Sequence, residues 1–208
     1  YSLSGPISVN GANCFVVSAQ SITLDCAGLS ITGDNTVNTI GVYSNQFNTT
    51  LKNCRINSFY SDVYFNGSSN GRIQNVTAIT SITGYGIRLE STSNNNIIIN
   101  SSGSSFYGIA LSSSHNNTII NFAGTSVWSG FGILIGASNN TIINSTGISS
   151  GSIGIYVTGS NNIIINSTGW AAGSDPACGI TIQGASNTLR NSNGTAAPTN
   201  YVCGIRIS

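Results

Sequence analysis

Short blocks in which apolar and polar residues alternate recur along the whole chain. The first kind of block has the form Gly-Ile-x-Ile, and alternation with a period of two is typical of β-strands. In one repeat Asp62 takes the place of the glycine. Successive anchor positions are 21 to 25 residues apart, which indicates an internal repeat. The anchors are Gly41, Asp62, Gly86, Gly108, Gly132, Gly154, Gly179 and Gly204.

A second block follows the anchor by about twelve residues and has the form Asn-x-Ile-x-Asn in the later repeats. Each repeat therefore holds two short strands, a third strand, and turns rich in Ser, Asn and Gly. One such unit cannot bury its own apolar face, whereas stacked units can. The pattern predicts an all-β fold, a right-handed parallel β-helix of about eight coils with three short strands per coil. It would be one domain over residues 1–208, with residues 1–13 as a lead-in and residues 14–208 forming the coils.

Strand periodicity also predicts which side chains point inward. In the first strand, the positions one before, one after and three after the glycine share a side, as do Tyr85, Ile87 and Leu89. In the second strand the central apolar residue, such as Ile98, points inward. The asparagine that closes the second block is expected at a bend with left-handed backbone, where stacked amides inside the helix can bond one another. This predicted ladder consists of Asn53, Asn75, Asn100, Asn121, Asn144, Asn166 and Asn191.

Composition limits the partners that such a repeat can have. Charged residues make up 5% of the chain and the net charge is +1, so hydroxyls and amides keep the surface in water. A nucleic-acid binder needs a basic stripe, and a membrane helix needs about 18 consecutive apolar residues. The sequence shows neither feature. The chain opens at Tyr1 and contains no Met, which we interpret as a mature product whose leader has been removed. We therefore expect an extracellular or cell-surface location.

The repeat pattern resembles a known family from Asn13 onward. Residues 22–28 have the sequence Ile-Thr-Leu-Asp-Cys-Ala-Gly and residues 51–54 the sequence Leu-Lys-Asn-Cys, which look like segments of secreted β-helix proteins. The chain resembles the NosD-like family of parallel β-helix repeat proteins, relatives of the pectate-lyase-type solenoids. The resemblance implies the solenoid fold, which hosts lyases, hydrolases, adhesins and scaffolds alike. It also implies copper delivery, but a chain with no Met and one His is expected to bind neither copper nor another cofactor.

The chain has five cysteines, an odd number. Cys178 and Cys203 both precede an anchor glycine in successive coils, so they should stack about 4.8 Å apart, within reach of a disulfide. Near the N-terminal end the disulfide candidates are Cys14 and Cys26 in the first coil, and Cys54 lies one coil further. We expect one bridge near each end of the solenoid, with simple burial of the thiols as the alternative.

Asn-x-Ser/Thr sequons occur throughout the chain. Sequons in the predicted inward ladder, at Asn75, Asn100, Asn144 and Asn166, should carry no glycan. Sequons in turns could be glycosylated, although a chain so rich in Asn, Ser and Thr produces many such triplets by chance. The candidate glycosylation sites in turns are Asn48, Asn66, Asn116, Asn139 and Asn193.

An active site needs ionisable groups that converge. The acidic residues lie at unrelated offsets from their anchors, so no pair of carboxylates stacks and no calcium cluster of the pectate-lyase type forms. Asp62 and Arg88 should lie close to each other, as a surface ion pair or, alternatively, as a catalytic pair. His115 lies in a Ser-His-Asn turn and is expected to be solvated. We predict neither a catalytic residue nor a metal site.

The outer side of the second strand is unusually apolar. Stacked isoleucines in the middle coils would form a patch of several hundred Å², which typically marks a contact with another molecule. Lys52, Arg72 and Arg190 bound it. Cover by residues 171–177 or 196–201 of the same chain is the alternative. This assembly face consists of Ile97, Ile99, Ile120, Ile143, Ile163 and Ile165.

The final strand, formed by Gly204, Ile205, Arg206 and Ile207, starts another coil without a polar cap. Open sheet edges at both ends would stack copies of the chain head to tail into a filament or surface layer. The first functional hypothesis is therefore a non-catalytic, extracellular structural protein whose partners are copies of itself.

Two other functions stay open. A carbohydrate-binding or adhesive module, with glycans as partners, would use the outward column of Tyr43, Tyr64 and Tyr156. A polysaccharide lyase or hydrolase would depend on Asp62 or Arg88. The tyrosine column is interrupted at Arg88, Ala110 and Leu134.

Overall fold

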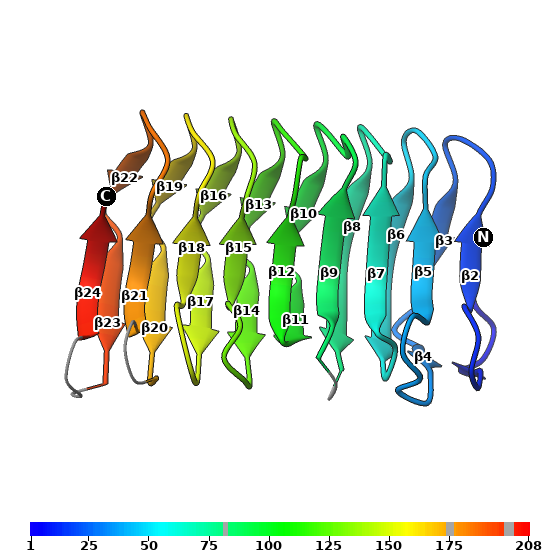
Figure 1. Ribbon diagram of the computed structural model, residues 1–208. Helices are drawn as coiled ribbons and strands as arrows, with labels where there is room; N and C mark the ends of the chain where they lie inside the picture. The colour runs from blue at the N-terminus through cyan, green and yellow to red at the C-terminus, as the bar shows by residue number, and fades with distance from the viewer. Residues whose placement is uncertain (81–82, 174–176, 198–201) are drawn as a thin grey trace.

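A computed structural model describes residues 1–80, 83–173, 177–197 and 202–208. The described residues form a parallel β-solenoid of about eight turns, in which each coil stacks on the one before it (Figure 1). The predicted all-β fold is thus confirmed. Within these ranges the chain forms no helix, and therefore no helix that could span a membrane.

The first strands of successive coils form one nine-stranded parallel sheet. Equivalent residues lie side by side in it, as Val42, Val63 and Ile87 do. Its strands are β2 (Phe15–Val17), β5 (Ile40–Ser44), β7 (Ser61–Asn66), β9 (Tyr85–Glu90), β12 (Tyr107–Leu111), β15 (Ile133–Ile135), β18 (Ile155–Val157), β21 (Ala177–Ile182) and β24 (Val202–Ile207).

The second and third strands form the other, 15-stranded sheet, because two long strands, β6 (Thr50–Asn57) and β8 (Arg72–Ile79), run through both positions. The remaining second strands are β3 (Thr23–Asp25), β10 (Ile97–Ile99), β13 (Thr118–Ile120), β16 (Thr141–Ile143), β19 (Ile163–Ile165) and β22 (Thr188–Arg190). The remaining third strands are β1 (Ile7–Ser8), β4 (Ser30–Thr32), β11 (Ser102–Ser105), β14 (Ala123–Ser126), β17 (Thr146–Ser149), β20 (Thr168–Ala171) and β23 (Asn193–Ala196).

The core is a set of aliphatic columns that run along the solenoid. Ile98 pairs in register with Ile73 on one side and Ile119 on the other, and all three side chains are fully buried. Ile87 and Leu89 belong to two further buried columns in the nine-stranded sheet. The columns are continuous because every coil places the same residue type at the same position, so the burial of each residue depends on its neighbours in the next coils.

The aromatic residue before three of the anchor glycines does not point inward as predicted, whereas Ile153, which precedes Gly154, is buried as predicted. Gly86 and Ile87 are buried, whereas Tyr85 is only half-buried. A Cβ on Gly86 would lie 2.7 Å from the carbonyl oxygen of Gly108 and 2.9 Å from the Cα of Gly103, so the two sheets meet backbone to backbone there. The glycine therefore takes an inward place, and the preceding side chain turns outward. The same correction applies to Tyr107 and Phe131, which are also half-buried.

Amides of the predicted asparagine ladder do bond one another, Asn75 donating to Asn53 at 3.1 Å and Asn121 to Asn100 at 2.9 Å. The ladder lies at the surface corners, however, and a different column of asparagines lies inside the solenoid. The closing asparagines have φ between 48° and 55°, so their left-handed backbone makes the corner. Asn53 is half-exposed, and the other six are exposed, which makes the inward placement wrong. The buried column is formed by the opening asparagine of each block. It comprises Asn96, Asn117, Asn140 and Asn162, and continues to the half-buried Asn187.

The lead-in segment continues the solenoid at its N-terminal end. Ser2 pairs with Asp25 of β3, and β1 pairs with β4 through Ile7 and Ile31. The lead-in therefore covers the edges of β3 and β4, which the sequence led us to expect open. At the other end, the side chains of Ile205 and Ile207 on β24 are 41% and 72% exposed.

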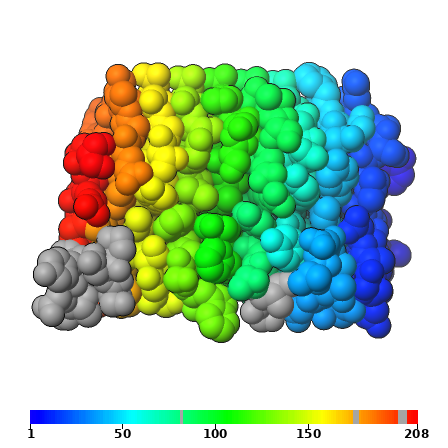
Figure 2. Space-filling view, viewed as in Figure 1, coloured from blue at the N-terminus to red at the C-terminus, as the bar shows by residue number. Residues whose placement is uncertain are grey.

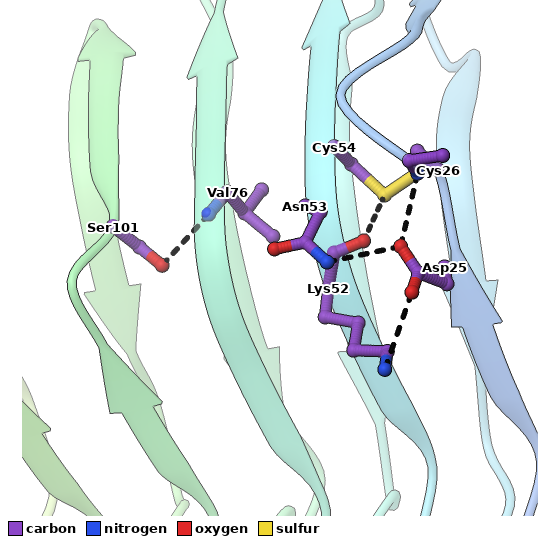
Figure 3. The surroundings of a disulfide bond; sticks show 8 residues. Asp25, Cys26, Lys52, Asn53, Cys54, Val76 and Ser101 are labelled. Carbon is purple, nitrogen blue, oxygen red and sulfur yellow. Dashed lines mark hydrogen bonds and ion pairs between the residues drawn. A yellow bond between two sulfur atoms is a disulfide. The ribbon is translucent and has the colours of Figure 1, made fainter.

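Two disulfides join successive coils, one near each end. Cys178 is joined to Cys203 across paired strands, with a Cα–Cα distance of 4.6 Å. Cys26 is joined to Cys54, with a Cα–Cα distance of 4.8 Å (Figure 3). Cys14 is a free thiol, so the prediction that it takes part in a bridge is wrong. The reason is position, because Cys14 precedes a strand of the other sheet, whereas Cys26 and Cys54 occupy matching corners.

Candidate functional site

The predicted contact between Asp62 and Arg88 does not form. Asp62 occupies an anchor position, where a glycine stands in the other coils, and its side chain is fully buried. One carboxyl oxygen accepts a hydrogen bond of 3.1 Å from the backbone N–H of Phe59, and the other has no partner. Burial raises the pKa of this carboxyl well above its ordinary value. The pair is therefore neither a surface ion pair nor a catalytic pair.

Arg88 instead lies on the outer side of the nine-stranded sheet. Its Nη2 forms an ion pair of 2.7 Å with Oε2 of Glu90. The guanidinium also lies over two rings, 4.5 Å from the centroid of Tyr64 and 4.6 Å from that of Tyr85. Arginine stacks well on aromatic faces because its guanidinium is planar and weakly hydrated. Arg88 thus connects two aromatic columns that would otherwise be separate.

Aromatic rings follow one another from coil to coil along this surface. Ring centroids are 5.7 Å apart between Tyr43 and Tyr64. They are 5.1 Å apart between Tyr85 and Tyr107, which are stacked. The series continues from Tyr107 to Phe131 at 5.7 Å, and from Phe131 to Tyr156 at 4.7 Å. We call these six rings, with Arg88, the aromatic strip. It is made of Tyr43, Tyr64, Tyr85, Arg88, Tyr107, Phe131 and Tyr156.

The outward turn at the anchor glycines is what makes the strip continuous. The tyrosine column predicted from the sequence stops at Arg88 and resumes only at Tyr156. In the intervening coils the rings come from the position before the glycine, at Tyr85, Tyr107 and Phe131. Sequence reasoning assigned those three residues to the core and therefore missed them. The signal was present, since an aromatic residue directly precedes the glycine in three successive repeats.

Polar side chains hold the tyrosine hydroxyls on one side of the strip. The hydroxyl of Tyr64 donates to Glu90 at 3.0 Å, and that of Tyr156 donates to Gln183 at 2.6 Å. The amide of Asn66 donates to the hydroxyl of Tyr43 at 3.4 Å. Burial and the bond to Glu90 raise the pKa of Tyr64 to about 12. The strip is therefore an ordered, uncharged surface at neutral pH, apart from the internal Arg88–Glu90 pair.

The isoleucines of the assembly face lie on the outer side of the 15-stranded sheet. Ile97 and Ile163 are 38% and 39% exposed, and the other four are half-buried. Four neighbouring strands, β10, β13, β16 and β19, carry the face, so it is flat and in register. The two segments considered as its cover include residues 174–176 and 198–201, which lie outside the described residues.

The remaining candidate residues lie apart from one another. His115 is half-buried in a turn, where its Nδ1 is 3.2 Å from the backbone nitrogen of Ser138. Of the sequon asparagines predicted in turns, Asn66 ends β7 and Asn193 begins β23, so the turn placement is wrong for these two. Asn66 is half-exposed, and the other four are exposed. The corner sequons, at Asn75, Asn100, Asn144 and Asn166, are exposed as well, so the argument that burial keeps them bare is wrong. In the described parts of the chain, no three His, Cys, Asp or Glu side chains come close enough to hold a metal ion.

Comparison with known proteins identifies the family. The model of the family described as "Periplasmic copper-binding protein (NosD)" matches residues 27–206, which is most of the solenoid. Comparison with curated proteins and with solved structures gave no match. Two disulfides indicate an oxidising, extracytoplasmic compartment, in agreement with that description. On its repeat pattern, its solenoid and this match, the chain belongs to the NosD family.

Proposed function

We propose that this chain is a non-catalytic β-solenoid, displayed at the cell surface or released from the cell, that binds an extended glycan along its aromatic strip. The observation that carries this proposal is the unbroken series of ring contacts from Tyr43 to Tyr156. Because Tyr85 and Tyr107 stack on each other, the strip offers a ligand ring edges and tyrosine hydroxyls. Tyrosine suits such a surface, since its ring makes apolar contacts and its hydroxyl makes hydrogen bonds. Hydrogen bonds already order several of the rings, which lowers the entropic cost of binding.

Affinity electrophoresis tests this function with the full chain. Its migration should be retarded in a gel that contains a suitable soluble polysaccharide. The double variant Tyr107→Ala/Phe131→Ala should lose the retardation, because it removes two adjacent rings of the strip. Trp170→Ala is the matched control, since Trp170 is 38% exposed on β20 of the other sheet. Retardation by none of a broad set of polysaccharides, or equal retardation of the double variant, would contradict the proposal.

Self-association is a second candidate function, favoured by the assembly face. A flat, uncharged face of in-register isoleucines is complementary to a second copy of itself, and face-to-face packing of two such sheets would bury it. Glycan binding and self-association use different surfaces and are compatible.

Sedimentation velocity and negative-stain microscopy test self-association. The double variant Ile97→Thr/Ile163→Thr replaces the two most exposed isoleucines of the assembly face with threonine, the residue found at the paired positions Thr118 and Thr141. We expect larger species for the unaltered chain and a shift toward monomer for the variant. A chain that stays monomeric at high concentration would contradict self-association and leave glycan binding untouched.

Copper binding, which the family's description implies, does not fit the donors of this chain. Copper sites in proteins use His, Cys and Met side chains. The chain has no Met and a single His. Cys14 lies in the first coil, whereas the turn that holds His115 is four coils further on, between β12 and β13. We therefore assign no copper site to this chain and base no part of its function on copper.

A further inference from the structure

We infer that the ligand of the aromatic strip is a neutral, β-linked glycan that lies along the solenoid axis with about one sugar per coil. This inference rests on the proposed glycan binding and names the class of ligand. Three features of the strip carry it. They are its direction and spacing, its charge balance, and the polar side chains on one of its sides.

The strip runs across the strands, because its rings come from equivalent positions of successive strands. Tyr43 is paired with Tyr64, and Tyr85 with Tyr107. Strands in a sheet are about 4.8 Å apart, which is close to the length of one sugar residue in an extended chain. A ligand in contact with all six rings therefore has to be extended and aligned with the solenoid. Figure 2 shows the coils as successive colour bands, and the ligand would cross these bands.

The charges within the strip compensate each other. On the outer side of the strands that carry the strip, β5, β7, β9, β12, β15 and β18, the charged side chains are those of Arg88 and Glu90, and they form an ion pair of 2.7 Å. The guanidinium is enclosed by two rings, and the carboxylate also accepts the hydroxyl of Tyr64. A uronic-acid polymer would bring one negative charge per sugar and find no free cation along the described strip. The surface thus favours a neutral glycan.

The geometry of the strip also selects the linkage. A row of rings in line contacts a ligand that is flat and straight over several residues. Sugars with equatorial linkages form such ribbons, with C–H groups on their faces and hydroxyls at their edges, whereas axial linkages make the chain coil. The edges of a ribbon would meet the polar side chains beside the strip, such as Asn66 and Gln183, which already bond the tyrosine hydroxyls.

Isothermal titration of the full chain with four hexasaccharides tests the inference. Cellohexaose and chitohexaose are neutral and β-1,4-linked, maltohexaose is neutral and α-linked, and hexagalacturonate is acidic. We expect either or both β-linked ligands to bind, and the other two to bind at least about tenfold more weakly, a difference of about 1.4 kcal/mol. Affinity should also rise from cellobiose to cellohexaose, because longer chains contact more rings.

Two variants sharpen this test. Tyr107→Ala should weaken binding about tenfold, whereas Tyr107→Phe, which keeps the ring, should restore most of that loss. Glu90→Gln frees the cation of Arg88, so the affinity of the variant for hexagalacturonate should rise. The Gln side chain can still accept the hydroxyl of Tyr64, which preserves the local structure.

The outcomes separate the inference from the proposed function. Preference for hexagalacturonate or maltohexaose, or no response of hexagalacturonate binding to Glu90→Gln, would overturn the neutral, β-linked assignment and leave glycan binding in place. Retardation in gels without binding of any of the four hexasaccharides would overturn it as well. No retardation in any gel together with no binding in any titration would overturn glycan binding itself.

Discussion

The two asparagine columns of the solenoid lie four residues apart in the same motif and do opposite things. In the buried column, the side-chain oxygen of Asn140 accepts the backbone N–H of Asn117 at 2.8 Å, and that of Asn162 accepts the N–H of Asn140 at 2.8 Å. In the corner column, Asn144 is exposed and contributes a backbone with φ of 49°. The first column satisfies the backbone of the coil before it, and the second changes the direction of the chain.

The difference shows what a turn in a solenoid needs. At the entry to the second strand, the backbone N–H groups face inward and require an acceptor from the next coil, which a buried amide supplies. At the exit, the chain needs a residue that tolerates left-handed backbone, and burial is irrelevant. Buried serines repeat the first solution after the corner, where Ser145 accepts the N–H of Phe122 and Ser167 accepts that of Ser145.

Asp62 lacks the partners in neighbouring coils that these buried asparagines and serines have, and its replacement should have the largest effect on stability. It is a buried polar side chain with one oxygen that no coil satisfies. Asp62→Asn should raise the melting temperature at pH 8, because an amide carries no charge to bury. Its pKa is raised in the folded state, so the folded chain holds this proton more tightly than the unfolded chain. The contribution of Asp62 to the unfolding free energy of the wild type is therefore fully present below about pH 4, where the carboxyl is protonated, and is lost as the pH rises.

Thermal unfolding between pH 4 and pH 9 measures this effect. The gap between Asp62→Asn and the wild type should widen as the pH rises and close near pH 4. Asp25→Asn is a control of opposite sign, because hydrogen bonds from Ala27 and Asn53, and the ion pair with Lys52, lower the pKa of Asp25 (Figure 3). Its contribution is present at neutral pH and is lost on acidification. A constant gap for Asp62→Asn would show that this carboxyl titrates normally.

A break in the buried column should have the next largest effect. Asn140→Ala removes the acceptor of the Asn117 N–H and the donor to the carbonyl of Ser138. Both groups are left without these partners in the interior, which should cost about 3 kcal/mol of unfolding free energy. Urea unfolding followed by circular dichroism measures it. A loss below about 1 kcal/mol would mean that water enters the solenoid and replaces the amide.

The repeat pattern was sufficient to predict the fold and the aliphatic columns, because their period is a property of the sequence alone. It was insufficient to assign the asparagines. In the motif Asn-x-Ile-x-Asn, each asparagine lies two residues from the isoleucine. Alternation therefore places both asparagines on the inward side, together with the isoleucine. Only the corner at Asn144, where the left-handed residue changes the direction of the chain, separates the two roles.

The aromatic strip was missed for a related reason. Strict alternation places Tyr85 on the same side as Ile87, and that side is the core. The close approach of Gly86 to Gly103 and Gly108 puts two consecutive residues inward, which shifts the alternation by one. That approach is a tertiary contact between the two sheets, and no local pattern in the first strand reports it. The pairing of Cys26 with Cys54, by contrast, follows once the corner residues are known.

The smallest effect is expected in the corner column and completes the comparison. Asn144→Ala forces a residue with a Cβ into left-handed backbone and should cost about 1 kcal/mol, whereas Asn144→Gly should be nearly neutral. The backbone bond from Asn144 to Ile165 survives in both variants. Urea unfolding of the Asn144 variants and of Asn140→Ala under the same conditions compares the two columns directly, because the two sites share one motif. If Asn144→Gly lowered the unfolding free energy as much as Asn140→Ala does, the corner amide itself would be essential. The two columns would then not have different roles.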